Sequence, residues 1–397
     1  MKVCFHTFGC RLNRAEALEE EARYLAAGYQ VVQDHGSADV IVIRGCSVTG
    51  RAENECRALV EHVKAKYPQK RLRVVGCYRD KIPLALPKPV TADEPLPMRT
   101  ARAFLKVQDG CAGGCSYCIV PQFRGQSVSL GFSALVERAR RLVAAGYHEI
   151  VVTGCNLALY ASEGKRLPEL VAALAAVDPA CRIRLGSLEP APVLEAMIDA
   201  MAAHANVCRS FYLSVQSGSN AVLHAMRRPY RIDAVDALVE RAVKAMPGVG
   251  LGCDLIAGFP GETELDFLAS ASFLRRHGFI RVHAFPYSAR PGTEAAKFVN
   301  QLPHALRSSR AHELTRIALA AHDRFAARQI GRTVEVVGEE HGFFAGWTGE
   351  YLRFEEGEPA STVRQLRPGG GHRRELHACL VRKVKGGVLY GSIVDGR

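Results

Sequence analysis

The dipeptide Gly-Cys occurs three times in the first hundred residues, each time just after a short apolar run. The three copies are Gly9-Cys10, Gly45-Cys46 and Gly76-Cys77. The apolar runs predict strands at Val3–Phe8, Val40–Arg44 and Leu72–Val75, and amphipathic stretches between them predict helices at Arg14–Ala27 and Arg51–Lys66. This alternation indicates a parallel sheet covered by helices, whose strands end at one common edge. We therefore expect three cysteines that are distant in sequence to converge at this edge.

The remaining chain divides into two further segments. A Pro-rich stretch from Pro83 to Pro97 is typical of a linker, so we place a first domain, a flavodoxin-like parallel sheet, at residues 1–98. Residues 99–330 hold six apolar runs separated by helical stretches, which predicts an incomplete (β/α)6 barrel with its chemistry on the loops after the strands. Residues 331–397, rich in Val, Gly and charge, predict a small antiparallel β-barrel. The six strands of the central segment are expected at Ala103–Val107, Glu149–Thr153, Arg182–Leu188, Phe211–Val215, Gly250–Ile256 and Ile280–Phe285.

The chain carries thirteen cysteines and a formal net charge of +12. The sequence shows neither a signal peptide nor a run of about 18 apolar residues, so we expect a cytoplasmic protein with no membrane partner. Disulfides are disfavoured in the cytoplasm, which leaves metal or redox chemistry for the cysteines, or a role as small buried hydrophobes. The positive charge suits a polyanionic partner.

One group of cysteines has the spacing of a cluster site. Cys111, Cys115 and Cys118 form a C-x3-C-x2-C sequence just after the first strand of the central segment, and we call them the loop triad. Three thiolates on one loop suit a [4Fe–4S] cluster, which normally takes four ligands, so one iron would stay open. A structural zinc site would need a fourth Cys or His nearby, and none lies within ten residues.

The loop triad and its surroundings resemble the radical S-adenosylmethionine (SAM) methylthiotransferase family, and the resemblance covers nearly the whole chain. It rests on Gly-Cys-x-x-Asn at residues 9–13 and on the triad itself, with Tyr117, a candidate SAM contact, before its last cysteine. Further matching stretches are Arg124-Gly-Gln-Ser127, Gly186-Ser-Leu-Glu-Pro190, Gln216-Ser-Gly-Ser219, Gly258-Phe-Pro-Gly-Glu262 and Phe285-Pro-Tyr-Ser-Ala-Arg-Pro-Gly-Thr293.

The resemblance implies an enzyme with two [4Fe–4S] clusters and SAM as cofactors. The loop triad would hold the cluster whose open iron chelates SAM, and an electron from it would release a 5′-deoxyadenosyl radical. Cys10, Cys46 and Cys77, the strand-end triad, would hold an auxiliary cluster that carries a sulfide. SAM would methylate this sulfur before the methylthio unit couples to the substrate carbon. The electron would come from a donor such as a flavodoxin or ferredoxin.

Four further residues are candidate SAM contacts by the same resemblance. Thr153 and Asn156 follow the second barrel strand, where this superfamily recognises the methionyl part of SAM. Glu189 and Gln216 follow the third and fourth strands and resemble positions near the ribose and carboxylate of SAM. A purely structural role stays open for each of the four. Cys155 should face the same cavity.

The substrate is the least specific inference. Residues 7–16, Thr-Phe-Gly-Cys-Arg-Leu-Asn-Arg-Ala-Glu, look most like the branch that methylthiolates C2 of threonylcarbamoyladenosine beside the tRNA anticodon. The alternatives are isopentenyladenosine in tRNA and an aspartate of a ribosomal protein. An iron–sulfur RNA-binding protein without enzymatic activity is the alternative from a different class.

Two regions depart from or extend this picture. Arg44-Gly45 stands where the family has Asn-Thr, and the stretch from Cys77 to Cys111 is short, so we expect the first domain to lack a strand–helix unit. The C-terminal segment resembles the TRAM domain, an RNA-binding module. Its residues 364–385 hold seven Lys or Arg and one Glu, which fits either a tRNA-gripping strip or a solvated surface.

Overall fold

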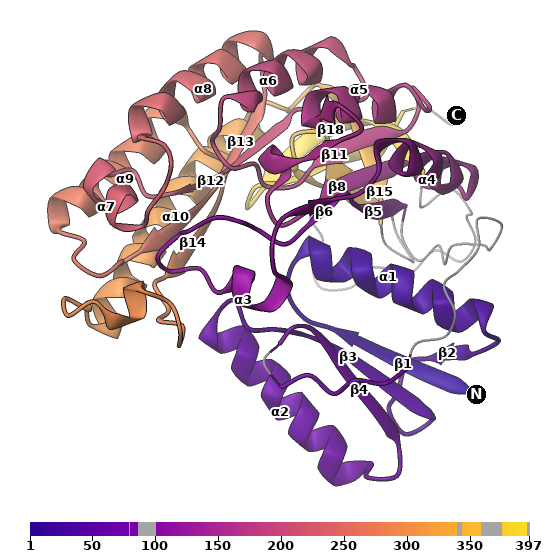
Figure 1. Cartoon of the computed structure of the whole chain (residues 1–397). Coiled ribbons are helices and arrows are strands. Elements are labelled where there is room, and N and C mark those ends of the chain that lie inside the picture. Colours follow the sequence, from indigo (N-terminus) through magenta and orange to yellow (C-terminus); the bar gives the residue numbers. More distant parts are fainter. Residues whose placement is uncertain (79, 86–100, 340–343, 359–374, 395–397) are drawn as a thin grey trace.

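The computed structural model describes residues 1–78, 80–85, 101–339, 344–358 and 375–394 (Figure 1). The first part is a four-stranded parallel sheet in the order β2-β1-β3-β4. Its elements are β1 (Lys2–Thr7), α1 (Arg11–Ala26), β2 (Gln30–Val32), β3 (Val40–Cys46), α2 (Gly50–Lys66) and β4 (Arg71–Cys77). This is the flavodoxin-like strand order without its fifth strand among the described residues. The expectation of a short first domain agrees with this sheet.

The two helices cover opposite faces of this sheet. Side chains of α2 pack with Ile41 and Ile43 in one apolar cluster, and Tyr24 of α1 packs with Val40 and Val42 in another. Strand β3 is buried along its whole length because it lies between β1 and β4 and is covered on both faces. Helix α1 also contacts the first barrel strand, so it lies between the sheet and the barrel (Figure 1).

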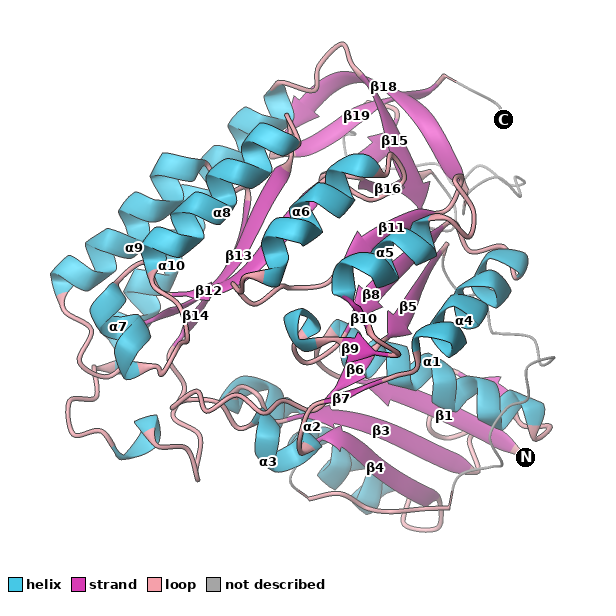
Figure 2. Cartoon of the chain, turned by 45° about the horizontal axis from the view of Figure 1, so that its top comes forward, coloured by secondary structure: helices cyan, strands magenta, loops and turns pink. Residues whose placement is uncertain are grey.

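The central part is a six-stranded parallel barrel that stays open. Its strands are β5 (Arg102–Lys106), β8 (Glu149–Thr153), β11 (Arg182–Leu185), β12 (Ser210–Gln216), β13 (Gly250–Ala257) and β14 (Arg281–Pro286). They form two three-stranded sheets joined by bridges at Ile183–Val207 and Leu188–Leu213. The helices α4 (Phe132–Ala144), α5 (Leu167–Ala175), α6 (Val193–Ala203), α8 (Ile232–Ala245), α9 (Glu264–His277) and α10 (His304–Ala327) lie on the outer side of these strands (Figure 2).

Shorter elements connect the barrel strands. They are β6 (Gln108–Asp109), α3 (Val120–Arg124), β7 (Val128–Ser129), the 3-10 turn Leu157–Leu159, β9 (Ala161–Ser162), β10 (Lys165–Arg166), α7 (Asn220–Ala225) and the 3-10 turn Ala295–Lys297. Strand β11 is shorter than the sequence pattern indicates. After Leu185 the chain changes its partner from β8 to β12, because the Leu188 amide donates to the Tyr212 carbonyl at 2.8 Å.

The C-terminal part is a closed five-stranded barrel. It consists of β15 (Thr333–Gly338), β16 (Ala345–Thr348), β17 (Arg353–Glu356), β18 (Leu376–Lys385) and β19 (Val388–Ile393), in the order β15-β16-β17-β19-β18. All neighbours are antiparallel except β17 and β19, which pair in parallel. The predicted fold class is therefore confirmed, with one parallel pair in place of a purely antiparallel barrel. No helix in the described parts of the chain is long and apolar enough to cross a membrane.

Tyr351 marks the junction where all three parts meet. Its ring centroid lies 3.6 Å from Cζ of Arg281 and 4.5 Å from Cζ of Arg184. Arg11 of α1 donates from Nη2 to the Tyr351 hydroxyl at 3.3 Å. Burial would raise the pKa of Tyr351, but four surrounding guanidinium groups outweigh burial and lower it to about 7. Contacts of these arginines with the ring and the hydroxyl of Tyr351 thus hold the C-terminal barrel against the other two parts.

Candidate functional site

The strand-end triad lies at the carboxyl edge of the first sheet, as its sequence pattern predicts. Cys46 and Cys77 are the last residues of β3 and β4 and stand directly opposite each other in the parallel register. Cys10 follows β1 and is the N-cap of α1. Gly9 has φ +92°, and a Cβ added to it would lie 2.9 Å from Cβ of Cys46. Glycine therefore precedes Cys10 because a larger residue would push two of the three cysteine loops apart.

The three thiols of this triad affect one another electrostatically. Cys46 and Cys77 are buried, and Cys10 is exposed. Burial raises the pKa of Cys46 to about 11, and the neighbouring Cys10 and Cys77 add to this shift. Burial also raises the pKa of Cys77, although the Arg124 guanidinium opposes it. Thiols in such surroundings bind a metal only with the loss of their protons, so ligation would be coupled to proton release.

The loop triad lies between β6 and α3, on the barrel side. The Gly113 amide donates to Sγ of Cys111 at 3.3 Å, and a Cβ on Gly113 would lie 3.2 Å from that sulfur. Burial raises the pKa of Cys118 to about 11, and the other two thiols of the triad add to the shift. Among the described residues, no three or more His, Cys, Asp or Glu side chains are arranged to hold a single metal ion.

Arg228 connects this triad to two of the predicted SAM contacts. Its Nη1 donates to Sγ of Cys115 at 3.1 Å, and its Nη2 lies 3.3 Å from the Glu189 carboxylate. Asn156 donates from Nδ2 to Glu189 Oε2 at 2.9 Å. The Asn156 Oδ1 atom is buried and has no hydrogen-bond partner among the described residues. This orphaned acceptor is what an ammonium group of a bound ligand would satisfy.

The other predicted contacts are less clearly tied to the loop triad. Tyr117 packs edge-on against Phe259 with ring centroids 6.5 Å apart, and its hydroxyl lies 3.5 Å from Arg228 Nη1. Thr153 is buried at the end of β8, and Gln216 ends β12 with φ +69°. The structure thus brings Asn156 and Glu189 together at the loop triad. The sequence analysis did not predict Arg228 as a site residue. The only sequence feature that could have indicated it is the basic turn in which it lies.

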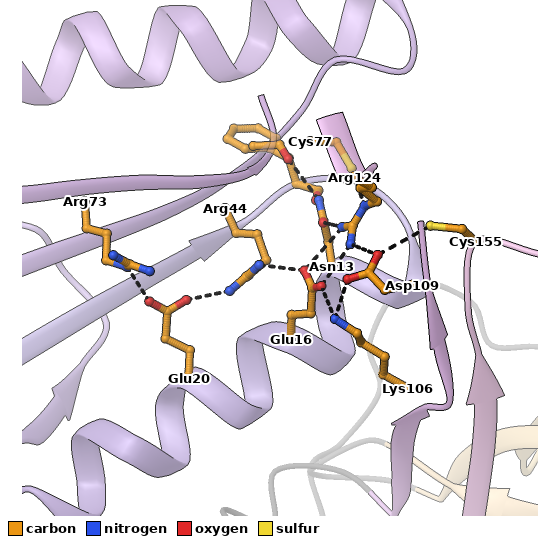
Figure 3. Close-up of polar contacts among 12 residues, drawn as sticks. Asn13, Glu16, Glu20, Arg44, Arg73, Cys77, Lys106, Asp109, Arg124 and Cys155 are labelled. Carbon is orange, nitrogen blue, oxygen red and sulfur yellow. Dashed lines mark hydrogen bonds and ion pairs between the residues drawn. The ribbon is translucent and has the colours of Figure 1, made fainter. Parts of the chain in front are cut away.

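A group of charged side chains extends from Cys77 of the strand-end triad to Asp109, two residues before the loop triad (Figure 3). Lys106 of β5 donates to Glu16 of α1 at 2.8 Å and to Asp109, next to the loop triad, at 2.6 Å. Burial would raise the pKa of Asp109, but Lys106 and Arg124 outweigh burial and lower it to about 2. Cys155 lies at the same group, with its Sγ 3.7 Å from Asp109 Oδ1. We call Glu16, Lys106, Asp109 and Arg124, together with the contacts among them, the interdomain polar group.

Comparison with known proteins first gives the class. The model of the radical SAM superfamily matches residues 105–274, and that of the uncharacterized protein family UPF0004 matches residues 2–92. Solved structures of TsrM, a radical SAM methyltransferase from Kitasatospora setae, show the same fold at 14% identity. One, with cobalamin and a [4Fe-4S] cluster bound, has a TM-score of 0.53 and covers 80% of this chain and 90% of its own. This chain is a radical SAM enzyme.

Sequence relatives then define the family. A threonylcarbamoyladenosine tRNA methylthiotransferase MtaB of Chlamydia pneumoniae is 32% identical, over 84% of this chain and 85% of its own. The Bacillus subtilis protein of the same name is 29% identical over 88% and 89%. A tRNA-2-methylthio-N(6)-dimethylallyladenosine synthase of Mycobacterium bovis is 31% identical over 83% and 75%. This chain belongs to the radical SAM methylthiotransferase family, as its motifs indicated, and its cofactors are SAM and [4Fe–4S] clusters.

Proposed function

We propose that this enzyme adds a methylthio group to C2 of threonylcarbamoyladenosine next to the anticodon of a tRNA. The observation that carries the proposal is that the interdomain polar group joins Cys77 of the strand-end triad, through Arg124, to Asp109 beside the loop triad. In this proposal the loop triad holds the cluster that binds SAM, and the strand-end triad holds the auxiliary cluster. When bound, these cofactors supply a carbon radical for the unreactive C2–H bond and a sulfur for its replacement.

The residues around the loop triad have distinct proposed tasks in this reaction. Asn156 accepts a hydrogen bond from the SAM ammonium group through its free Oδ1. Glu189, held by both Asn156 and Arg228, is positioned for the ribose hydroxyls. Tyr117 and Phe259 close the apolar side of the site and exclude water. Thr153 and Gln216 line the strand ends of the same cavity in this proposal.

The barrel interior supports a polar substituent on the adenine. Asp254 and His283 are register partners on β13 and β14, and their side chains are 22% and 48% exposed. Tyr212 donates to Asp254 Oδ1 at 2.8 Å, and His283 Nδ1 lies 3.5 Å from the same oxygen. The second ring nitrogen of His283, Nε2, can then bind a substrate group. A threonylcarbamoyl group carries a carboxylate and a urea that such groups can bind, whereas an isopentenyl group is apolar.

The exposed face of β14 also offers a surface for the base. Phe285 lies two residues beyond His283 on the same face, and 41% of its surface is exposed. An aromatic ring beside a polar pair is a common way to hold an unstacked base of a single-stranded loop. The anticodon loop presents its bases in this way. The ribosomal-protein alternative gives no use for such a ring.

The C-terminal barrel is proposed to grip the tRNA backbone. Lys383 on β18 is exposed and lies 3.7 Å from Glu358. Arg373 and Arg374, the centre of the predicted basic strip, lie outside the described residues. We keep the three domains at residues 1–98, 99–330 and 331–397 as a proposal, since the first boundary also lies outside the described residues. A cytoplasmic location and a flavodoxin or ferredoxin as electron donor stay predictions.

The substrate is tested by nucleoside mass spectrometry of tRNA from a deletion strain. We expect 2-methylthio-threonylcarbamoyladenosine to disappear and to return with the intact gene. Loss of the methylthio derivative of isopentenyladenosine would establish the alternative tRNA substrate. Unchanged tRNA nucleosides together with a loss of methylthioaspartate from a ribosomal protein would contradict the proposal altogether.

The two triads are tested by separate triple Ala variants of the anaerobically prepared enzyme, which should contain about eight irons. The loop-triad variant should keep about four irons and lose SAM cleavage. The strand-end variant should keep SAM cleavage and lose methylthio product. Cys379→Ala, a buried cysteine of the C-terminal barrel, is the matched control and should keep all iron. A strand-end variant that still transfers sulfur would refute the proposed division of tasks.

A further inference from the structure

Arg124 belongs to the barrel side of the molecule but contacts a cysteine of the first sheet. It is the last residue of α3, six positions after Cys118 of the loop triad. Its Nε lies 2.7 Å from Sγ of Cys77, at the end of β4 (Figure 3). The side chain is only 7% exposed. A guanidinium group therefore donates to a sulfur of the strand-end triad inside a site that excludes most water.

The direction of this guanidinium group is fixed because all of its donors are used. A guanidinium has five N–H groups in a rigid plane. Besides the bond to Cys77, Nη1 donates to Glu16 Oε1 and Asp109 Oδ1, both at 2.9 Å. Nη2 donates to Asn13 Oδ1 at 2.9 Å and to Glu16 Oε2 at 3.2 Å. Five N–H groups thus have five acceptors, and rotation of the plane would break several bonds at once.

The backbone beside Arg124 is tied to the loop triad. The amide of Cys111 donates to the carbonyl of Gly125 at 3.0 Å. The side chain of Arg124 meanwhile bonds Asn13 and Glu16, which follow Cys10 on α1. Arg124 therefore connects the loop that carries the loop triad with two segments of the strand-end triad, namely the end of β4 and the start of α1. The relative position of the two triads depends on it.

The charge of Arg124 has a second consequence at Cys77. Lys106 and Arg124 face the carboxylates of Glu16 and Asp109, and Glu16 also pairs with Arg44. At the sulfur itself, however, the nearest charge is the positive guanidinium. A cluster gains negative charge when it is reduced, and hydrogen bonds to its ligand sulfurs favour the reduced form. Arg124 should therefore make the auxiliary cluster easier to reduce.

We propose that Arg124 is a positioning residue that raises the reduction potential of the auxiliary cluster through Cys77 and fixes this cluster against the radical SAM loop. The inference rests on the proposed function in one respect, namely that Cys77 is a cluster ligand. It assigns the cation of the Arg124-Gly-Gln-Ser127 sequence to the auxiliary cluster rather than to SAM, although Arg124 lies next to the SAM-binding loop in sequence.

The test is a redox titration of the anaerobic, full-length holoenzyme, followed by electron paramagnetic resonance. The loop-triad triple Ala variant, which should keep only the auxiliary cluster, identifies the signal of that cluster. Arg124→Gln removes the charge and most donors, and Arg124→Lys keeps the charge but not the planar fork. At a fixed potential we expect the ratio of reduced to oxidised auxiliary cluster to fall about tenfold with Gln, equivalent to roughly 59 mV for one electron. The reduction potential of the auxiliary cluster in Arg124→Lys should lie between those of Arg124→Gln and the parent.

Arg44 provides the matched control. It donates to the same carboxylate, Glu16, at 2.7 Å and to Glu20 at 2.6 Å, but it is not hydrogen-bonded to a sulfur. Arg44→Gln should therefore weaken the interdomain polar group and leave the potential of the auxiliary cluster unchanged. Equal shifts in both variants would show that only the general fit of the domains matters, and would overturn the proposal.

Two further outcomes keep the inference falsifiable. If Arg124→Gln loses iron, the Lys variant with full iron still decides: an unchanged auxiliary potential in that variant would refute the role of the N–H···S bond. If the strand-end triple Ala variant keeps all its iron, Cys77 is not a ligand, and the proposed function fails independently of Arg124. Failure of the inference alone would instead leave the iron content and the methylthio product of the parent enzyme as proposed.

Discussion

Replacement of Glu149 with Gln tests how the C-terminal barrel is held to the radical SAM barrel. The Glu149 carboxylate is fully buried and accepts from Arg184 at 2.7 and 3.0 Å and from Arg182 at 2.6 and 3.1 Å. The same two guanidinium groups donate to the carbonyls of Trp347 and Thr348 in β16 at 2.9 and 2.8 Å. One carboxylate thus orients two arginines, and the arginines bind the C-terminal barrel.

The magnitude follows from burial. Arg184 and Arg182 are 1% and 4% exposed, so a neutral partner would leave their charges poorly compensated in a region without water. Removal of one partner from a buried ion pair costs about 3–5 kcal/mol. The exposed Glu137–Arg140 pair, at 57% and 61% exposure, is the matched control. Its Glu137→Gln variant should change the free energy of unfolding by no more than about 1 kcal/mol.

Trp347 provides the assay, because it is the single tryptophan of the chain and its carbonyl is one of the acceptors. Urea unfolding followed by its fluorescence should show the barrel released at lower urea in Glu149→Gln. Burial would raise the pKa of Glu149, but Arg184 and Arg182 outweigh burial and hold it well below its ordinary value. In the parent, the ionised Glu149 therefore stabilises the fold at any pH above the ordinary glutamate pKa, and this stabilisation is lost as the pH falls below it. Glu149→Gln should not show this pH dependence. Equal urea midpoints for Glu149→Gln and Glu137→Gln would refute this reasoning.

Four other changes have defined outcomes. Tyr351→Phe should remove a tyrosinate absorbance that appears near neutral pH. It should also remove the gain in stability that the parent shows as the pH rises from about 7 to the ordinary tyrosine pKa of about 10. A parent without the absorbance would contradict the lowered pKa of Tyr351. Asn156→Ala should weaken SAM binding about tenfold, measured by equilibrium dialysis, with unchanged iron content. His283→Leu should raise the KM for tRNA carrying threonylcarbamoyladenosine while SAM cleavage without tRNA persists; an unchanged KM would exclude substrate contact. Neutralising Lys383 and Lys385 together should reduce the salt dependence of tRNA binding, and an equal slope would mean that they are only solvated surface.

The strand-end triad could be predicted from the sequence because it depends only on local patterns. Apolar runs of strand length fix where each strand ends, and parallel strands end at the same edge. The observed β3 and β4 end at Cys46 and Cys77 themselves. The glycines before these cysteines have a steric cause that the pattern did not reveal. At Gly45, for example, an added Cβ would lie 2.6 Å from Sγ of Cys56.

The small barrel was predicted less accurately, for reasons of length and backbone geometry. Strand β16 has four residues, Ala345–Thr348, and includes a glycine, so its apolar pattern is too short to detect. The next strand, β17, begins only at Arg353, because Tyr351 lies in the turn before it. Tyr351 has φ +75°, a left-handed conformation that is typical of turns and uncommon for a residue other than glycine. Its side chain is directed to the arginines of the other domains by this turn.

Arg124, Arg228 and His283 could not be assigned their partners from the sequence. Each makes its important contact with a residue at least 29 positions away, and the direction of a long side chain is set by tertiary packing alone. Arg124 is part of a stretch that the motif comparison did identify, but the motif gave no reason for an arginine. Its partner, Cys77, lies in a different domain. Sequence patterns thus find cysteine triads more readily than the long side chains that contact them.

Side-chain contacts through helix α1 link the part that carries the strand-end triad to the part that carries the loop triad. Helix α1 lies between the first sheet and β5, so the sheet approaches the barrel through the polar face of one helix. Lys106 and Arg124 from the barrel both bond Glu16 on that face, and Glu16 also accepts from Arg44 of the sheet. A carboxylate shared by three cations has few alternative positions, because a shift toward one cation lengthens the bonds to the others. In the proposed reaction the two triads act together, and this shared carboxylate helps to hold the first sheet against the barrel.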